Sequence, residues 1–412
     1  MELKNDCYTI QGVDVRDLCS EFGTPLYVYD AEVIERQVTA FKSAFAGFDC
    51  KVKYACKANT SLAILEEMLS NGTGLDTVSI SEIRMGLMVG FDPREIVFTP
   101  NCVDFSEIEE AVALGVNINI ENIPNLEQFG KTYGNSVPCF VRLNPGIHAQ
   151  LNSDQVDWWH RQSKFGISAD QLDQVKEIED EYNLNIHGLH IHSSSVIMSP
   201  ELFITGAKSV FNIVRQFKNI KYIDFGGGIK IDVGDDKDVI DLDALGRNLR
   251  PVFEAFCKEY GTDIQLWFEP GRFLICEAGI LLTECNMIKR NGGTSFVGTD
   301  SGFNQLIRPM FYDAFHEIVN TSNPNGESRK YTVVGNVCEI DNFAVNRSLN
   351  EVRARDILAI KTAGAYGYSM ASTYNSRFRP AEILIKNGRP HLIRRRDSFD
   401  DLVRNQLVII DD

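Results

Sequence analysis

The sequence lacks the features that mark membrane, secreted and disulfide-stapled proteins. No apolar run reaches the about 18 residues that a membrane-spanning helix needs. The amino terminus has neither the basic start nor the apolar stretch of a signal peptide. The 10 cysteines are scattered, without a C-x-x-C pair, which disfavours a disulfide scaffold and a thiolate zinc site. We therefore expect a cytoplasmic protein that does not bind membranes.

The chain also has fewer basic than acidic residues. Lysine and arginine number 41 against 57 aspartates and glutamates, a net charge of -16, which disfavours nucleic acid or an anionic membrane as a partner. The apolar fraction of 44% is ordinary for a globular protein with a large core. A chain of 412 residues predicts two or three domains, or a barrel of about 250 residues with one companion domain.

Short β-rich runs alternate with longer helical stretches over the first two thirds of the chain. The strand-like runs are residues 26–29, 52–55, 95–98, 117–120, 139–143, 186–191, 222–225 and 265–269. Close to eight strand–helix repeats predict a (β/α)8 barrel of the TIM type. After residue 272 strand-like runs and turn signals dominate, which predicts a mostly β second domain. We place the barrel at residues 26–270, and residues 1–25 with 271–412 in the β-rich domain.

Lys57 follows a strand-like run in the segment YACKAN (residues 54–59). Ligand chemistry in a barrel belongs at the carboxyl ends of the strands, where a buried lysine amine can lose its proton and attack an aldehyde. A lone lysine at a strand end is more often an ordinary surface residue. Four later segments favour the catalytic interpretation: HIHSSS (190–195), DFGGG (224–228), EPGR (269–272) and GAYG (364–367).

The triple glycine at Gly226, Gly227 and Gly228 directly follows an apolar strand-like run, the seventh along the chain. Glycines allow backbone N–H groups to approach a phosphate without interference from a Cβ atom. Phosphate sites in barrels often follow the seventh and eighth strands. A glycine turn without any ligand is the alternative.

Glu269 ends the next strand-like run and can keep a pyridine nitrogen protonated. His192 offers a flat face to stack on such a ring, and Ser195 a hydroxyl group for a phosphate. A metal site at His190 and His192 is the alternative, but neither histidine has a carboxylate or cysteine at ligand spacing, so we expect no metal. For His190 a structural role is the stronger alternative.

In the second domain, Cys338 and Glu339 precede Asp341 in the segment CEID. A thiol near a reacting carbon can return a proton to that carbon, as a general acid. Inert packing is the alternative for any one of ten cysteines.

Nearly the whole chain, residues 23–401, resembles the diaminopimelate decarboxylases, which belong to the fold type III pyridoxal phosphate decarboxylases. The resemblance rests on the segments quoted above and on GTPLYVYD (23–30), RLNP (142–145), SKFGI (163–167), LIRPMFYDAFH (306–316), AGAYG (363–367), MAS (370–372) and RPAE (379–382). It implies the alanine racemase-like architecture of a barrel with a β domain.

The resemblance implies pyridoxal 5'-phosphate as the cofactor and assigns a role to each matching residue. Lys57 would carry the cofactor, Glu269 would contact the pyridine nitrogen, and His192 would cover the ring face. The other implied cofactor contacts are Ser195, Gly226, Gly227, Gly228 and Tyr366 at the phosphate, with Asp76 and Arg142 near the ring.

The implied substrate contacts include both positively charged side chains and a carboxylate. An amino acid with a zwitterionic end requires both, because it carries a carboxylate and an ammonium group. The implied contacts are Arg272, Arg308 and Tyr312 for a carboxylate, Glu339 for the distal ammonium, and Tyr366 beside them. Cys338 would come from the second subunit of a homodimer with shared active sites.

The implied reaction is decarboxylation of meso-2,6-diaminopimelate to L-lysine and CO2, the last step of lysine biosynthesis. The alternatives are decarboxylation of ornithine, lysine or a carboxylated polyamine, and a non-catalytic protein that binds pyridoxal phosphate. Glu339 with Arg308 favours diaminopimelate, because ornithine-type relatives generally carry aspartate after the cysteine. The chain departs from the family at SSSV (193–196), at CEID and at residues 150–162.

Overall fold

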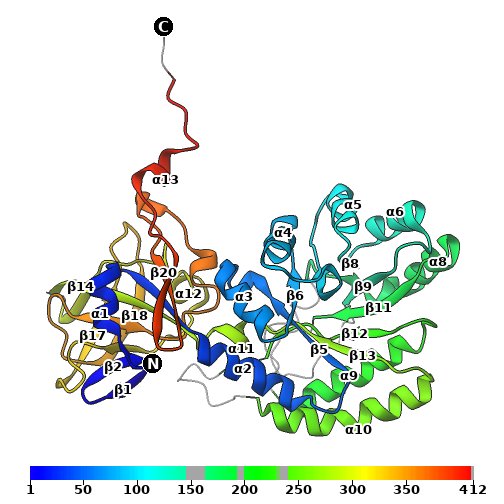
Figure 1. Ribbon diagram of the computed structural model, residues 1–412, viewed down its shortest axis with the longest axis horizontal. Helices are drawn as coiled ribbons and strands as arrows, with labels where there is room; N and C mark the ends of the chain where they lie inside the picture. Colours follow the sequence, from blue (N-terminus) through cyan, green and yellow to red (C-terminus); the bar gives the residue numbers. More distant parts are fainter. Residues whose placement is uncertain (145–162, 193–198, 230, 232–239, 410–412) are drawn as a thin grey trace. The chain divides into compact units, whose positions relative to one another are not determined.

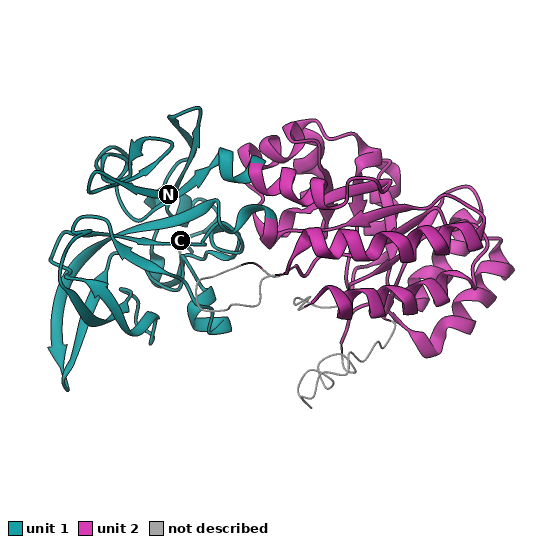
Figure 2. Cartoon of the chain, turned by 90° about the horizontal axis from the view of Figure 1, so that it is seen from below, with its two compact units in different colours: residues 1–35, 232–237, 274–412 teal, residues 36–231, 238–273 magenta. Residues whose placement is uncertain are grey.

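The computed structural model describes residues 1–144, 163–192, 199–229, 231 and 240–409. The chain forms two compact units, shown in different colours in Figure 2. Unit 1 comprises Met1–Glu35, Asp232–Lys237 and Leu274–Asp412. Unit 2 comprises Arg36–Ile231 and Asp238–Phe273. Among the described residues, no helix is long and apolar enough to cross a membrane.

Unit 2 is built around a closed barrel of eight parallel strands, as the alternating pattern predicts. In chain order the strands are β5 (Cys50–Ala55), β6 (Gly74–Thr77), β7 (Ile96–Phe98), β8 (Asn117–Ile120), β9 (Cys139–Asn144), β11 (Ile186–Ile191), β12 (Tyr222–Asp224) and β13 (Gln265–Phe268). Their order in the sheet is β9-β11-β12-β13-β5-β6-β7-β8, and pairing of β8 with β9 closes the ring. The short strand β10 (Ile167–Ser168) pairs with β9.

Helices surround these strands in Figure 1. They are α3 (Leu62–Ser70), α4 (Ile80–Val89), α5 (Phe105–Ala113), α6 (Ile123–Tyr133), α8 (Leu172–Tyr182), α9 (Pro200–Val214) and α10 (Leu242–Tyr260), while α2 (Ala31–Ala44) and α11 (Arg272–Ile275) cross the boundary between the units. Several helices begin at a side chain that accepts a backbone N–H hydrogen bond, such as Ser79 for α4 and Asp241 for α10. Such caps satisfy N–H groups that the helix itself leaves unpaired.

Aromatic rings fill part of the barrel. Phe140 packs at a tilt against Trp267 and stacks on Tyr222, with ring centroids 4.8 and 5.6 Å apart. Lys53 is buried beside them, with Nζ 4.3 Å from the centre of the Trp267 ring and 2.7 Å from a carboxylate oxygen of Glu95. The pairing with Glu95 makes burial of this charge tolerable.

Unit 1 is mostly β, as the sequence predicts. Its main sheet runs β18-β17-β15-β14-β4-β20-β21, and β19 joins β14 to β16. The bounds are β4 (Leu26–Asp30), β14 (Gly279–Asn291), β15 (Thr294–Thr299), β16 (Ile318–Asn320), β17 (Ser328–Val334), β18 (Asn342–Asn350), β19 (Ile357–Ile360), β20 (Ala381–Lys386) and β21 (Arg389–Arg394). The helices of this unit are α1 (Val15–Phe22), α12 (Arg308–Tyr312) and α13 (Phe399–Val403).

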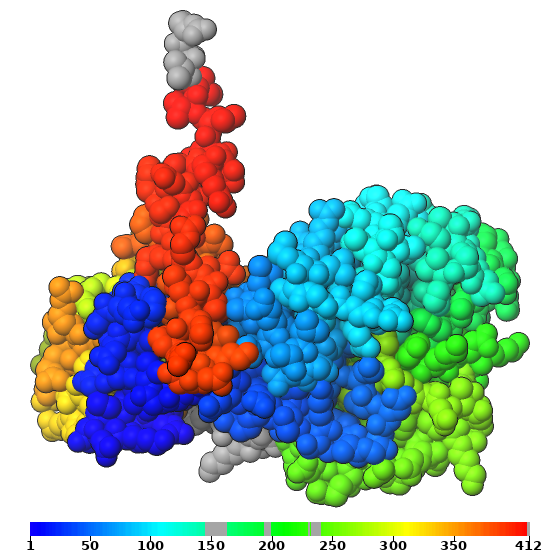
Figure 3. All heavy atoms as spheres, in the orientation of Figure 1, coloured from blue at the N-terminus to red at the C-terminus, as the bar shows by residue number. Residues whose placement is uncertain are grey.

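The amino-terminal run belongs to unit 1 but has a sheet of its own. This sheet consists of β1 (Glu2–Lys4), β2 (Cys7–Ile10) and β3 (Val13–Asp14). Ile10 anchors it in an apolar cluster with Leu26, Val28 and Ile383 of the main sheet. At the other terminus, Leu407 and its neighbours extend from α13 as an exposed segment, red in Figure 3.

Strand β4 corrects one expectation. The sequence suggested that it opens the barrel, with a domain boundary at residue 26, but it pairs with β14 and β20 in unit 1, and unit 2 begins at Arg36. The reason lies in its tyrosines, whose buried hydroxyl groups need partners. Tyr27 donates to the backbone carbonyl of Gln305 at 2.6 Å and Tyr29 to Glu382 at 2.7 Å, both in unit 1.

Because β4 lies in unit 1, strand β6 completes the eight strands of the barrel. Its sequence, Gly-Leu-Asp-Thr, has too few β-branched or aromatic residues to predict a strand from pattern alone. Lys57 therefore follows the first barrel strand, β5, while the triple glycine still follows the seventh, β12.

Candidate active site

Lys57 lies in the short 3-10 turn η1 (Cys56–Ala58) that directly follows β5. Its amine donates a hydrogen bond of 2.6 Å to Oδ2 of Asp76. Asp76 belongs to β6 and pairs in register with Ala55, two residues before the lysine, so the two strands fix the contact. The sequence predicted both residues at the cofactor, and the structure brings them together.

Asp76 is almost completely buried, with 1% of its surface exposed. Burial, reinforced by the nearby Glu269, raises the pKa of its carboxyl group, and Lys57 opposes this rise. Its second oxygen, Oδ1, has no hydrogen-bond partner within the described part of the chain. A buried carboxylate with one open oxygen is suited to receive a polar group of a ligand.

Glu269 follows β13 and is paired with a histidine near the end of β11. Nε2 of His190 lies 3.2 Å from Oε2 of Glu269. Burial alone would raise the pKa of Glu269, but His190, Lys57 and His192 outweigh it and hold this pKa well below its ordinary value. The carboxylate therefore stays ionised, as a partner of a protonated pyridine nitrogen must.

His192 directly follows β11. Burial, together with the charges of Arg142 and Lys57, lowers its pKa to about 3, so the ring is neutral near neutral pH. A neutral, flat ring is suited to stack on an aromatic ligand. His190 and His192 have ring centroids 6.5 Å apart.

His190, His192 and Glu269 also form a group that could hold a metal ion, with potential ligand atoms within 4.8 Å of one another. The sequence did not predict this group, because no carboxylate stands at ligand spacing from either histidine. The fold supplies one from β13, two strands away from β11 in the barrel. The sequence predicts a pyridine ring here instead, with Glu269 at its nitrogen and His192 on its face.

The glycine segment after β12 permits very close packing. A Cβ atom on Gly226 would lie 2.4 Å from Nδ1 of His192, and one on Gly227 would lie 2.5 Å from the backbone oxygen of Glu269. Gly226 and Gly228 have positive φ angles of 65° and 101°. Only glycine meets both demands without strain.

Two of these glycines already use their N–H groups within the protein. Gly226 donates to the Asp224 carboxylate at 2.8 Å, and Gly227 donates to Nδ1 of His192 at 3.2 Å. The loop therefore fixes the orientation of His192. Phosphate binding by Gly226, Gly227 and Gly228 stays a prediction.

Asp224 is a site residue to which the sequence gave no role. It ends β12 and is buried, and burial together with the nearby Glu269 raises the pKa of its carboxyl group well above the ordinary value. A carboxylate two residues before a glycine run is the signal that could have identified it, because it can accept the N–H groups of the turn.

Arg142 contributes a buried positive charge from β9. Burial lowers the pKa of its guanidinium, while Glu269 and Glu121 act in the opposite direction. Glu121 itself accepts hydrogen bonds from Asn101 and from the backbone N–H group of Cys102, at 2.6 and 3.1 Å. Arg142 thus lies within electrostatic reach of Glu269 and Glu121, and its predicted place near a cofactor ring stays a prediction.

Arg272 stands at the start of α11, one residue after a tightly packed glycine. A Cβ atom on Gly271 would lie 3.2 Å from the Cβ atoms of Ala55 and Ala58, on either side of Lys57. This packing brings the EPGR segment against the turn that carries the lysine. Ser195, residues 150–162 and the SSSV segment lie outside the described residues.

Unit 1 holds a second group of predicted residues around Cys338. The Cys338 thiol lies 3.3 Å from the hydroxyl group of Tyr374 and accepts from Nδ2 of Asn375 at 3.1 Å. The Tyr374 hydroxyl also lies 3.3 Å from Oε1 of Glu339. The hydrogen bonds of Tyr374 and Asn375 lower the pKa of Cys338, which suits proton transfer. The sequence did not predict either partner, because both lie more than 30 positions further along the chain.

Arg308, Tyr312 and Tyr366 form a third group, also within unit 1. The Arg308 guanidinium lies 5.3 Å from the centre of the Tyr312 ring and 5.8 Å from that of Tyr366. Tyr366 has a positive φ of 57°, an unusual conformation for a bulky residue and one that often marks functional positions. The structure thus brings together three residues predicted to bind substrate or cofactor.

Comparison with known proteins identifies the family. Residues 31–276 match the family model of the pyridoxal-dependent decarboxylase, pyridoxal binding domain. The chain is 36% identical to a diaminopimelate decarboxylase of Methanothermobacter thermautotrophicus, with 97% of this chain and 95% of the relative covered. It is 31% identical to that of Escherichia coli K12, covering 95% and 96%.

Solved structures agree. The diaminopimelate decarboxylase of M. jannaschii in complex with L-lysine matches with a TM-score of 0.92 at 30% identity, over 99% of this chain and 98% of that one. The corresponding Helicobacter pylori enzyme, also complexed with L-lysine, gives a TM-score of 0.86 at 30% identity, covering 95% and 98%. The chain therefore belongs to the pyridoxal-dependent decarboxylases and, within them, to the diaminopimelate decarboxylase family.

Proposed function

We propose that this protein uses pyridoxal 5'-phosphate to remove one carboxyl group from meso-2,6-diaminopimelate, which yields L-lysine and CO2. The observation that carries the proposal is a cluster of four charged or titratable side chains at the ends of the barrel strands. In it, the ionised Glu269 pairs with His190, and Lys57 pairs with Asp76. The relatives that cover almost the whole chain carry the name of this activity.

The residues at the barrel mouth fit the cofactor. Oε1 of Glu269 and Oδ1 of Asp76 are buried and have no hydrogen-bond partner within the described residues, so both can accept from a bound group. When bound, pyridoxal phosphate supplies an electron-withdrawing pyridinium ring. Lys57 would hold its aldehyde carbon, Glu269 would keep a proton at the pyridine nitrogen, and His192 would cover one face.

The remaining cofactor contacts are proposed on the strength of the family resemblance. Asp76 and Arg142 would flank the ring, while the glycine loop, Ser195 and Tyr366 would hold the phosphate. The exact fit of the glycine loop around His192 supports this placement, because any side chain on Gly226 would displace the ring-stacking histidine.

For the substrate, we assign Arg308, Arg272 and Tyr312 to the second carboxylate and Glu339 to the distal ammonium. An arginine fork and a carboxylate are the groups that recognise an amino acid end. Tyr366 would lie beside them, since it shares the Arg308 group in unit 1. Cys338 would return a proton to the carbon that has lost CO2, and its lowered pKa eases this transfer.

We further propose a homodimer in which Cys338 serves the barrel of the other subunit. Large apolar side chains are exposed in unit 1 on both sides of the cysteine in sequence, such as Ile340, which is 80% exposed, and Phe311, which is 67% exposed. Exposed apolar groups of this kind commonly mark interfaces. They support an association surface on unit 1.

Product analysis tests the activity. The pyridoxal phosphate-loaded protein is incubated with meso-diaminopimelate, and CO2 and lysine are quantified together, with Lys57→Ala as the blank. We expect the two products in equal amounts. Lysine formation at the level of the Lys57→Ala protein would refute the proposed reaction.

A further inference from the structure

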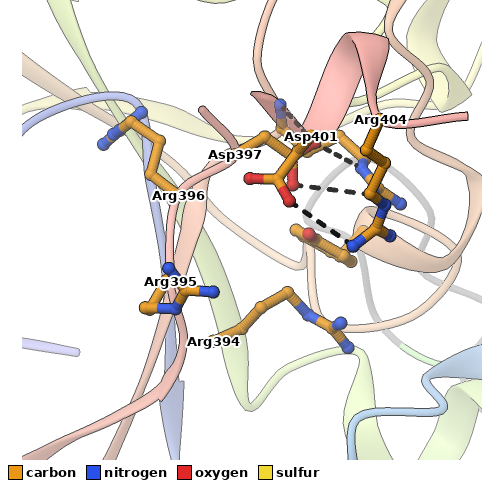
Figure 4. A pocket seen from close by; sticks show the side chains of 8 residues that line it. Arg394, Arg395, Arg396, Asp397, Asp401 and Arg404 are labelled. Atoms are coloured by element: carbon orange, nitrogen blue, oxygen red, sulfur yellow. Dashed lines mark hydrogen bonds and ion pairs between the residues drawn. The ribbon is translucent and has the colours of Figure 1, made fainter. Parts of the chain in front are cut away.

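A second cluster of charged side chains lines a cavity of about 230 Å³ in unit 1 (Figure 4). Five arginines line it: Arg379, Arg394, Arg395, Arg396 and Arg404. None of the lining residues is assigned to the cofactor or the substrate. A space of this size can admit a small solute.

Acidic partners neutralise three of the five arginines. Arg379 pairs with Asp397 at 2.7 Å and Arg404 with Asp401 at 3.7 Å, the latter pair labelled in Figure 4. Arg394 pairs with the completely buried Glu382.

Arg395 and Arg396 form no ion pair with a carboxylate within the described part of the chain. Arg396 instead donates to the backbone carbonyl of Pro25 at 2.7 Å, and Arg395 is exposed. The cluster therefore carries two positive charges in excess, although the whole protein has a net charge of -16. A local surplus of this sign attracts anions.

Tyr368 supplies an independent indication of a ligand. It lines the cavity, is 8% exposed, and its buried hydroxyl group has no hydrogen-bond partner among the described residues. Arg394 and Arg379 pack on its ring, at 4.7 and 6.0 Å from the centre. Burial raises the pKa of Tyr368 to about 12, so at neutral pH the hydroxyl is a hydrogen-bond donor. Buried polar groups are rarely left unpaired.

We propose that this cavity is a binding site for a phosphate-class dianion, either inorganic phosphate or a phosphate monoester. A dianion balances the two excess charges, and the planar guanidinium fork matches phosphate oxygens with two parallel hydrogen bonds. The Tyr368 hydroxyl donates one more hydrogen bond to the same ligand. This site is additional to the proposed active site, whose phosphate contacts are other residues.

Titration calorimetry of the pyridoxal phosphate-loaded protein with inorganic phosphate tests the site. The variants are Tyr368→Phe, which removes the open hydroxyl without changing the charge, and Arg395→Gln, which removes an unpaired cation. Arg290→Gln is the matched control, because Arg290 is an exposed arginine of β14 outside the cavity. We expect saturable binding in the wild type and the control, weakened at least tenfold in both cavity variants.

A parallel titration with glycerol phosphate decides between free phosphate and a monoester, since the tighter ligand identifies the source. Acetate is titrated as the monoanion control and should bind at least tenfold more weakly than phosphate. No saturable binding, equal binding by Tyr368→Phe and wild type, or acetate binding as tight as that of phosphate would each overturn the proposal. Retained cofactor absorbance and an unchanged melting temperature verify that Tyr368→Phe is folded, so this variant decides if Arg395→Gln is unstable.

Discussion

Lys57 is the residue on which the cofactor assignment depends. Its amine is fixed at 2.6 Å from Asp76 by two adjacent strands. We expect Lys57→Ala to abolish turnover and to remove the visible absorbance of the bound cofactor, because the variant lacks the amine that binds the aldehyde. Lys51→Ala is the control, since Lys51 lies on β5, the strand before the turn that carries Lys57, is half-buried and pairs with Glu95. A visible band in Lys57→Ala that borohydride bleaches while the cofactor stays covalently attached would assign the cofactor to another lysine.

Arg308 is the residue to which we assign substrate selection. We expect Arg308→Ala to lower kcat/KM for meso-diaminopimelate by roughly thirty- to a thousandfold, or about 2 to 4 kcal/mol, while the cofactor spectrum stays intact. Arg308→Lys keeps the charge but loses the planar fork, so an intermediate effect is expected. Steady-state kinetics on both variants measures this. Unaltered efficiency in Arg308→Ala would show that another residue binds the second carboxylate.

At the residue scale, the sequence predicted the side chains whose chemistry is recognisable by type and position. Lys57, Glu269 and His192 follow strand-like runs, and the barrel brings such positions to one end. Residues that act by holding others were not predictable. Asp224 and Asn375 matter through hydrogen bonds to Gly226 and Cys338, and these contacts exist only in the folded chain.

At the scale of single elements, the loop after β12 sets the position of His192. We expect Gly227→Ala to reduce cofactor retention, because the added Cβ atom would lie 2.5 Å from the backbone oxygen of Glu269. Gly206→Ala is the control: Gly206 lies within α9 and has open space around its Cα, so alanine should be neutral or stabilise the helix by about 0.5 to 1 kcal/mol. Cofactor content after gel filtration measures the effect. Full retention by Gly227→Ala would show that the loop can shift freely.

Strand β11 contains a further histidine, His187, whose lowered pKa gives a testable prediction about stability. His187 packs edge-on against the rings of Phe140 and Tyr222, with centroids 4.8 and 5.1 Å away, and burial, aided by the charge of Lys221, lowers its pKa from 6.5 to about 4. Between these pH values the unfolded chain binds the extra proton, so stability is complete above pH 6.5 and falls as the pH drops towards 4.

We expect His187→Phe to lose less stability than the wild type between pH 7 and pH 5. The difference over the full window is on the order of 3 kcal/mol. Chemical denaturation at each pH measures it. Parallel stability curves for the two proteins would show that His187 does not contribute to acid sensitivity.

Sequence patterns were least reliable at element boundaries. The run LYVYD predicted a strand correctly but not its sheet, because five buried residues suit a barrel strand and a β-domain strand equally well. The hydrogen-bond partners of Tyr27 and Tyr29 decide which sheet the strand joins, and these partners lie more than 270 positions further along the chain. In contrast, the barrel as a whole followed from the repeat of strands and helices, since parallel pairing needs a crossover helix each time.

For the whole molecule, the proposed dimer makes a distinctive prediction. Lys57→Ala and Cys338→Ala proteins should each be inactive, yet an equal mixture should recover activity through hybrid dimers with one intact site. Random exchange predicts about a quarter of the wild-type activity. Mixing of differently tagged chains verifies the exchange. If exchange occurs and activity stays absent, each active site is built from one chain.

The central claim is that the protein selects a substrate with a second carboxylate. The most direct measurement is the rate of CO2 release by the cofactor-loaded protein, compared at equal concentrations of meso-diaminopimelate, its L,L isomer, lysine, ornithine and arginine. The account predicts that meso-diaminopimelate is decarboxylated at least thirtyfold more efficiently than lysine or ornithine, which lack the group assigned to Arg308, roughly the value of one charge-assisted contact. Faster release from lysine or ornithine than from meso-diaminopimelate would contradict it.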